Sequence, residues 1–129
     1  MLKLRKEQLH DPVLADRHKL IKDIEEHLAE YRPDIIAAYS RPYLLWLIND
    51  SIDIASKFRI DDVFSMRLFV RLRWEIAPIF YEQMQIAHVL SQTERSAEDR
   101  FKELGSDSFA QAWEDAEHLD KSSDSDAHF

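Results

Sequence analysis

A single glycine in 129 residues limits this chain more than any other feature of its sequence. Tight β-hairpins and phosphate-binding loops need glycine, because they use backbone conformations that other residues rarely adopt. The length suits one hydrophobic core, and 45% hydrophobic residues beside 33% charged ones are ordinary for a soluble globular protein. We therefore predict an all-α fold. It would be a compact single-domain bundle of about five to six helices over residues 1–120, with a disordered acidic tail at residues 121–129.

Several chemical functions lack the residues that they require. The chain has no cysteine, so it can form neither a disulfide nor a cysteine zinc site. None of its six histidines occurs in the HExxH spacing, and only His10 follows a glutamate, Glu7, in the ExxH spacing, of which a di-iron helical bundle needs two. The N-terminus has no apolar signal-peptide core, and no apolar run is long enough to span a bilayer. We predict a soluble, cytoplasmic, non-enzymatic protein with no cofactor and no metal.

The negative charge is concentrated in the C-terminal third. Residues 1–93 carry 13 Lys and Arg against 14 Asp and Glu, a net charge of −1, whereas residues 94–129 carry 4 against 11, a net charge of −7. This distribution does not favour nucleic acid as a partner, because nucleic-acid binding depends on basic patches. The acidic end either keeps the protein soluble or attracts a basic protein partner.

Hydrophobic spacing and proline positions predict three helical regions in the first half. The segment "LADRHKLIKDIEEHLAEY" has a helical apolar stripe, ended near Arg32 by Pro33. A second region over residues 33–58 should break at Arg41–Pro42, and a third should begin with Asp61 or Asp62 as N-cap and end near Pro78. The stripe comprises Leu14, Ile21, Ile24, Leu28 and Tyr31, and a short turn with Leu2, Leu4 and Leu9 should precede it, ending at Pro12.

Three more helices are expected in the second half. The segment "FYEQMQIAHVLS" should form one helix with Phe80, Met84 and Ala87 in line. Ser96 should cap a helix that ends at Leu104, with Gly105 in the left-handed conformation. Asp107 or Ser106 should cap the last helix, whose apolar stripe comprises Phe109, Ala112, Trp113, Ala116 and Leu119.

Three arginines are set in the nearly apolar segment "RLFVRLRWEIAPIF", residues 67–80. On a helix, Arg67, Arg71 and Glu75 form one lane, and almost every other position is apolar. Such a helix belongs in the middle of a bundle, and the lane would be the strip left open to solvent. Arg73 lies inside the apolar arc, so it should pair with a carboxylate or contact a partner. The candidate carboxylates are Asp50, Asp53 and Glu82.

Trp46 raises a similar question in the second helical region. It lies opposite the face formed by Leu44, Ile48 and Ile52, and Tyr43 flanks it. An outward tryptophan beside a tyrosine is typical of a protein-binding hot spot, although another helix of the same chain could cover it. We therefore predict a partner-binding surface of aromatic and arginine side chains: Tyr43, Trp46, Arg67, Arg71 and Arg73.

The pattern of the second half resembles a group of small helical proteins encoded in type VI secretion effector gene clusters. In "LFVRLRWEIAPIFYEQMQIAHVLSQTERSAEDRFKEL" it comprises an apolar-x-Pro-x-Phe turn at Ile76–Phe80, the pair Val89–Leu90, and a capped helix from Ser96 to Leu104 containing Arg100. The segments "LRKEQ" and "LIKDIEEHLAEYRPDII" are similar to the N-terminal half of that group. The resemblance covers about residues 1–115.

The resemblance implies a small protein that works by binding another protein. Its partner would be a type VI secretion effector, the adaptor that loads it, or a spike-tip protein. An accessory or co-chaperone role is our first expectation, and an immunity protein that neutralises a toxin by direct binding is the alternative. Two features depart from the group's pattern, since Ala77 stands where a glycine is expected and the acidic serine-rich tail is peculiar to this chain.

Overall fold

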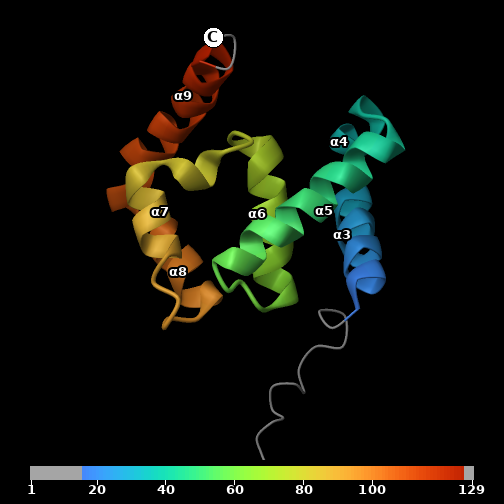
Figure 1. Cartoon of the computed structure of the whole chain (residues 1–129), viewed down its shortest axis with the longest axis horizontal. Helices are drawn as coiled ribbons and strands as arrows, with labels where there is room; N and C mark the ends of the chain where they lie inside the picture. Colours follow the sequence, from blue (N-terminus) through green and yellow to red (C-terminus); the bar gives the residue numbers. More distant parts are fainter. Residues whose placement is uncertain (1–15, 127–129) are drawn as a thin grey trace, which may run out of the picture. The chain divides into compact units, whose positions relative to one another are not determined.

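The computed structural model describes residues 16–126, and places the side chains of residues 16–119. These residues contain helices and no strand, so the predicted all-α class is confirmed for the described part of the chain (Figure 1). The chain divides into two compact units, residues 1–70 and 71–129, and the boundary falls within a helix. That residues 1–120 fold as one domain stays a prediction. The short turn and Leu14, both predicted before Asp16, lie outside the described residues.

Helix α3 (Arg17–Tyr31) opens the first unit. Its N-cap is Asp16, whose side chain accepts a hydrogen bond from the backbone N–H of Lys19 at 3.2 Å. Its buried face comprises Leu20, Ile24 and Leu28. Tyr31 was predicted on this face, but it is 60% exposed and its ring lies 4.8 Å from that of His27 instead of entering the core.

The predicted break between the next two helices is confirmed, at a slightly earlier position. Helix α4 (Pro33–Ala38) ends before Tyr39 and Ser40, and helix α5 (Arg41–Lys57) begins after them. Pro42 therefore lies in the first turn of α5, where a missing backbone N–H leaves no helical hydrogen bond unmade. The buried apolar residues of α5 are Leu44, Leu47, Ile48, Ile52 and Ala55.

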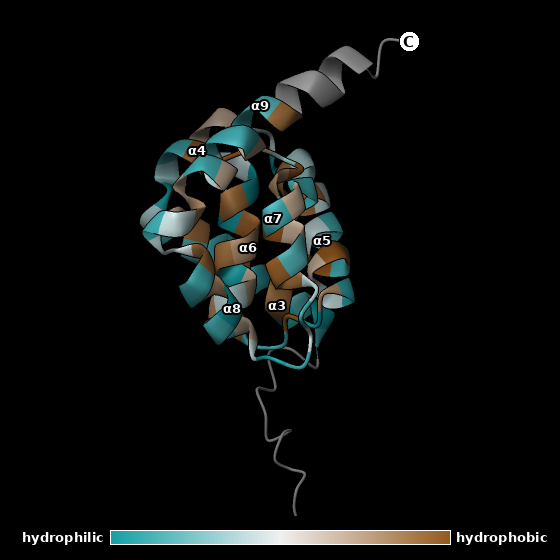
Figure 2. Ribbon diagram, turned by 90° about the vertical axis from the view of Figure 1, so that its left-hand side faces the viewer, coloured by the Kyte–Doolittle hydropathy of each residue, from teal (hydrophilic) through white to brown (hydrophobic). Residues whose placement is uncertain are grey.

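Helix α6 (Val63–Glu75) starts after a tight turn. Arg59 has a φ of 55°, a left-handed conformation that no other described residue adopts and that was not predicted. Asp62 is confirmed as the N-cap, since its Oδ2 accepts from the Ser65 N–H at 2.9 Å. In the first unit α6 buries Met66, Phe69 and Val70, and hydrophobic residues run along this helix in Figure 2.

In the second unit, the segment "FYEQMQIAHVLS", predicted as one helix, forms two shorter elements. The 3-10 helix η1 (Phe80–Glu82) is separated from helix α7 (Met84–Leu90) by Gln83, whose extended backbone changes the direction of the chain. The Gln83 side chain caps α7 by accepting from the Ile86 N–H at 3.0 Å. The predicted alignment of Phe80 with Met84 is wrong, because Phe80 is fully buried and Met84 is 79% exposed.

Helix α8 (Ala97–Leu104) begins as predicted, with the Ser96 hydroxyl accepting from the Asp99 N–H at 3.0 Å. The left-handed conformation predicted for Gly105 is wrong, since its φ is −82°. Its N–H bonds to the carbonyl oxygens of Phe101 at 3.0 Å and Lys102 at 3.2 Å. The helix therefore ends by tightening its last turn, and a left-handed residue is not needed.

The 3-10 helix η2 (Asp107–Phe109) leads into helix α9 (Ala110–Asp126). Neither predicted residue caps α9 directly, because η2 comes between Ser106 and the helix. Of the predicted stripe, Ala112 and Ala116 are buried, whereas the larger residues Phe109, Trp113 and Leu119 are half-buried. The structure continues α9 to Asp126, beyond the end predicted at Lys121, since adding a residue to an existing helix costs far less than starting one. Residues 127–129 of the predicted tail lie outside the described residues.

Candidate protein-binding surface

Three aromatic side chains form a stack on the surface of the first unit. The Tyr39 and Tyr43 rings have centroids 5.3 Å apart and are inclined by 30°, and the Tyr43 and Trp46 rings are 6.3 Å apart and inclined by 27°. The three residues are 44%, 45% and 59% exposed, respectively. We call this group the aromatic ladder. No described residue covers Trp46 enough to make it part of the core, so of the two alternatives left open by the sequence, the outward position is the one observed.

The local sequence explains why the ladder forms at this place. Tyr43 and Trp46 are three residues apart on α5, so they lie on neighbouring turns, opposite the buried side of the helix. The Ser40 hydroxyl caps α5 by accepting from the Tyr43 N–H at 3.4 Å, and Tyr39 lies just before this cap. Tyr39 was missing from the predicted surface. Its spacing of four residues from Tyr43 was a usable signal, but the predicted break at residues 41–42 obscured it.

A stacked, exposed aromatic group is well suited to binding. Each aromatic residue can bury roughly 150–250 Å² of surface, and its few rotatable bonds keep the entropic cost of ordering it small. In the ladder, stacking already restricts the rings before any partner arrives. Exposed apolar groups of this kind on a soluble protein commonly mark interaction sites.

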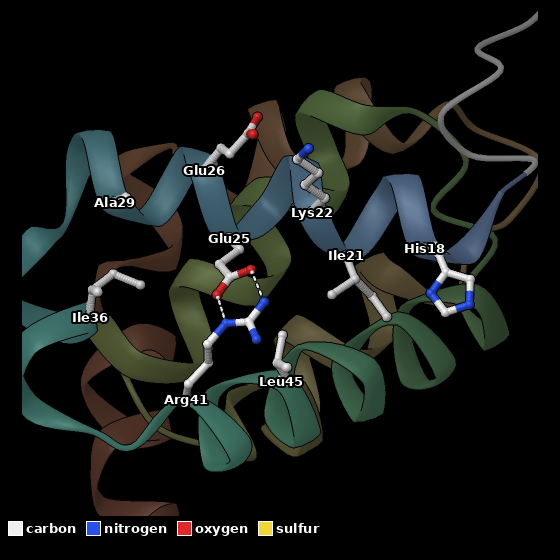
Figure 3. A pocket seen from close by; sticks show the side chains of 9 residues that line it. All are labelled: His18, Ile21, Lys22, Glu25, Glu26, Ala29, Ile36, Arg41 and Leu45. Atoms are coloured by element: carbon white, nitrogen blue, oxygen red, sulfur yellow. Dashed lines mark hydrogen bonds and ion pairs between the residues drawn. The ribbon is translucent and has the colours of Figure 1, made fainter.

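A groove of about 750 Å³ lies between α3 and α5 (Figure 3). Its apolar walls come from Ile21 and Ala29 on α3, Ile36 on α4 and Leu45 on α5. In Figure 3, Ile21 and Leu45 lie on one side of the Glu25–Arg41 pair, and Ala29 and Ile36 lie on the other. The groove therefore has two apolar halves separated by a charged bridge.

The bridge joins α3 to the start of α5. Arg41 Nε and Nη2 donate to the Glu25 carboxylate at 2.9 and 3.3 Å. These hydrogen bonds, with the attraction of the negative charge, raise the pKa of the Arg41 guanidinium above its ordinary value. The Arg41 side chain is 69% exposed, so solvent screens the pair and it adds little to stability.

The prediction that Arg67 lies on a strip open to solvent is wrong. Its Nε and Nη2 donate to the two carboxylate oxygens of Asp23 at 2.8 and 2.6 Å, so α3 covers this part of α6. The two side chains are 34% and 21% exposed, respectively. Asp23 was not predicted as the partner of Arg67, because their separation along the chain gives no local spacing signal.

Replacing Arg67 tests whether this pair is structural. Arg67→Met should lower the free energy of unfolding by about 1–2 kcal/mol, because it leaves the half-buried Asp23 carboxylate without its bidentate donor. Urea denaturation followed by circular dichroism would measure the change. A variant as stable as the parent would show that the pair contributes nothing to the stability of the fold.

The other two predicted arginines lie in the second unit. Arg71 Nε donates to Glu75 at 3.2 Å, the predicted pair along the helix, and both side chains are half-buried. Arg73 is only 6% exposed. Its Nε donates to the backbone carbonyl of Pro78 at 2.8 Å, and its guanidinium carbon lies 5.8 Å from the centre of the Tyr81 ring. Of its predicted mates, Asp53 pairs with Arg17 at 2.8 Å. Burial thus removes Arg73 from the surface that a partner could reach.

The described residues contain no cluster of three or more His, Cys, Asp or Glu side chains that could hold a metal ion. In the same part of the chain, no helix is both long enough and apolar enough to cross a membrane. No protein-family model, no curated protein and no solved structure matches this sequence. The aromatic ladder and the groove between α3 and α5 are the candidate binding features of the first unit.

Proposed function

We propose that this protein has no enzymatic activity and acts by binding another protein through the aromatic ladder. The observation that supports this proposal is the stack of Tyr39, Tyr43 and Trp46, all between 44% and 59% exposed. Tryptophan and tyrosine are among the residue types in which interface energy concentrates. A stack that is 44–59% exposed contributes less to the stability of the fold than a buried one, because about half of its surface stays in contact with water.

The resemblance noted in the sequence suggests the class of partner. We propose a type VI secretion effector, or the adaptor that loads it, with this protein as an accessory factor or co-chaperone in the cytoplasm. Such a role needs a stable protein-binding surface and no catalytic group. The structural features that support it are the ladder and the nearby helical groove, both of which suit a protein partner.

An immunity protein that neutralises a toxin by direct binding is the second candidate. The observation that favours it is the net charge of −7 over residues 94–129, which would complement a basic toxin such as a nuclease. The two candidates differ in phenotype. Loss of an immunity protein should kill cells that still make the toxin, whereas loss of an accessory protein should reduce secretion of the effector without harming the producing cell.

The binding proposal is tested with a partner isolated from the native host and identified by mass spectrometry. Titration of that partner by calorimetry should show Trp46→Ala weakening the complex at least about tenfold, or roughly 1.4 kcal/mol. The variant should keep the helicity and melting temperature of the parent, because Trp46 is 59% exposed.

Phe64→Ala is the matched control, since it removes another exposed aromatic side chain of the first unit, one that is 69% exposed and outside the ladder. Its affinity should stay within about twofold of the parent, as expected for a residue outside the interface. Equal weakening by both variants, or full-strength binding by Trp46→Ala, would contradict the role of the ladder.

A further inference from the structure

The surface of the second unit is acidic, because acidic residues outnumber basic ones and its arginines are either buried or paired with acids. Residues 71–119 contain five Lys and Arg against ten Asp and Glu, a net charge of −5. Arg73 and Arg100 are buried, and two more arginines pair with acids, Arg71 with Glu75 and Arg95 with Glu103. Of the lysines and arginines in this stretch, only Lys102 lies exposed outside such a contact. The other eight carboxylates of this stretch, outside these two ion pairs, are all exposed to solvent.

A hollow of about 440 Å³ lies within this unit, between the start of α7 and α9. Its apolar surface comes from Met84 and Leu119, and its charged rim from Glu82 and Asp115. Met84 is 79% exposed, a larger fraction than that of any other large hydrophobic residue in the described chain. The Ile86 N–H donates to the side-chain oxygen of Gln83, the N-cap, so α7 begins at Met84.

Among the residues whose side chains the structure describes, no lysine or arginine lines the hollow, and His118 is the only basic side chain there. Asp115 accepts a hydrogen bond from the neutral amide of Gln111 at 3.0 Å, and a neutral donor does not cancel the charge of the carboxylate. Exposed Glu114 and Glu117 on the same helix extend the negative potential beyond the rim.

We propose that this hollow binds a basic amphipathic helix of another protein. An apolar side chain of that helix would contact Met84 and Leu119, and lysines or arginines three or four positions away would pair with Glu82 and Asp115. Methionine suits such contacts, because its flexible, polarisable side chain adapts to differently shaped apolar groups. An acidic segment would be repelled by the same carboxylates, so charge complementarity selects the basic class.

This second surface goes beyond the proposed function and does not depend on it. The hollow is built from residues 82–119, and the ladder from residues 39–46. Variants of each can be compared directly in the full-length protein. If one proposal fails, the other can still hold.

The test uses two model peptides of about 15 residues, one with leucines on one helical face and lysines on the other, and one with glutamate in place of lysine. Fluorescence anisotropy measures peptide binding, and a salt concentration of about 0.15 M screens long-range electrostatic attraction. The lysine peptide should bind the parent protein, and the glutamate peptide should bind at least about tenfold more weakly. Met84→Ser and the double variant Glu82→Lys/Asp115→Lys should each lower the affinity for the lysine peptide by about tenfold or more.

Glu94→Lys/Glu98→Lys is the matched control, because it changes the net charge equally at two exposed positions outside the hollow. It should alter the affinity by no more than about twofold, apart from the general effect of net charge. Equal losses in the two double variants would overturn the proposal, since binding would then be diffuse attraction to an acidic surface. Unchanged binding by Met84→Ser, or loss of binding by Trp46→Ala, would also overturn it.

Discussion

Replacing Arg100 by methionine should lower the free energy of unfolding by about 2–4 kcal/mol, although the new side chain is apolar and suits a buried site. Arg100 is only 1% exposed and is the largest fully buried side chain among the described residues. Its Nη1 donates to the carbonyl of Leu90 at 2.6 Å, and its Nε lies 3.1 Å from the Arg95 carbonyl and 3.3 Å from the Ser96 carbonyl.

The physical reason is the loss of hydrogen bonds to buried backbone groups. Leu90 is the last residue of α7, so its carbonyl oxygen has no partner within the helix, and a cation there also offsets the negative end of the helix dipole. A buried carbonyl left without a donor costs about 1–3 kcal/mol. Relief from burying a charge offsets part of this loss, which keeps the expected total moderate.

Urea denaturation monitored at the helical circular-dichroism band measures the effect. Lys102→Met is the matched control, because it makes the same kind of change on the exposed side of α8 and should stay within about 0.5 kcal/mol of the parent. If Arg100→Met were as stable as Lys102→Met, the loop between α7 and α8 would not depend on the guanidinium.

Phe80→Ala should destabilise the second unit by about 3–5 kcal/mol, the usual cost of emptying a buried aromatic site. Phe80 is fully buried, and its ring stacks on Trp113 with centroids 5.7 Å apart. The Trp113 indole N–H in turn donates to the Leu104 carbonyl at 2.7 Å, so the cavity would lie beside a residue that links α9 to the end of α8.

Thermal and urea unfolding of Phe80→Ala should be compared with those of Met84→Ala, a nearby truncation at a position 79% exposed. The exposed variant should differ from the parent by less than about 0.5 kcal/mol. Similar stability for both variants would mean that the stacked pair contributes no more than a surface side chain. Tryptophan fluorescence of Phe80→Ala should also shift, since Trp113 loses its ring neighbour.

Local sequence signals predicted the helices and most of their starting points. Asp62 and Ser96 cap helices as expected, because an N-cap depends on only a few neighbouring residues. The same signals failed at Gly105 and Gln83. A helix can end without a left-handed glycine, and a glutamine side chain can cap a helix within an unbroken apolar pattern.

The candidate surface was predicted only in part. The outward position of Tyr43 and Trp46 followed from helical geometry, because their face opposes the apolar side of α5. Tyr39 lies before the start of α5, and its four-residue spacing from Tyr43 was hidden by the break predicted at residues 41–42. The hollow beside Met84 was not foreseen, since it depends on how α7 and α9 meet.

The sequence by itself determined the class of this protein: one glycine, no cysteine and apolar residues at helical spacing favour helices wherever the chain folds. Only the tertiary structure decided what the arginines do. Arg67 pairs with Asp23, which is 44 positions away in the chain. Arg73 donates a hydrogen bond to the Pro78 carbonyl, beyond the end of α6, and Arg100 donates one to the Leu90 carbonyl at the end of α7. A guanidinium on a long flexible side chain can reach several partners, and packing alone determines which of them lies within hydrogen-bonding distance.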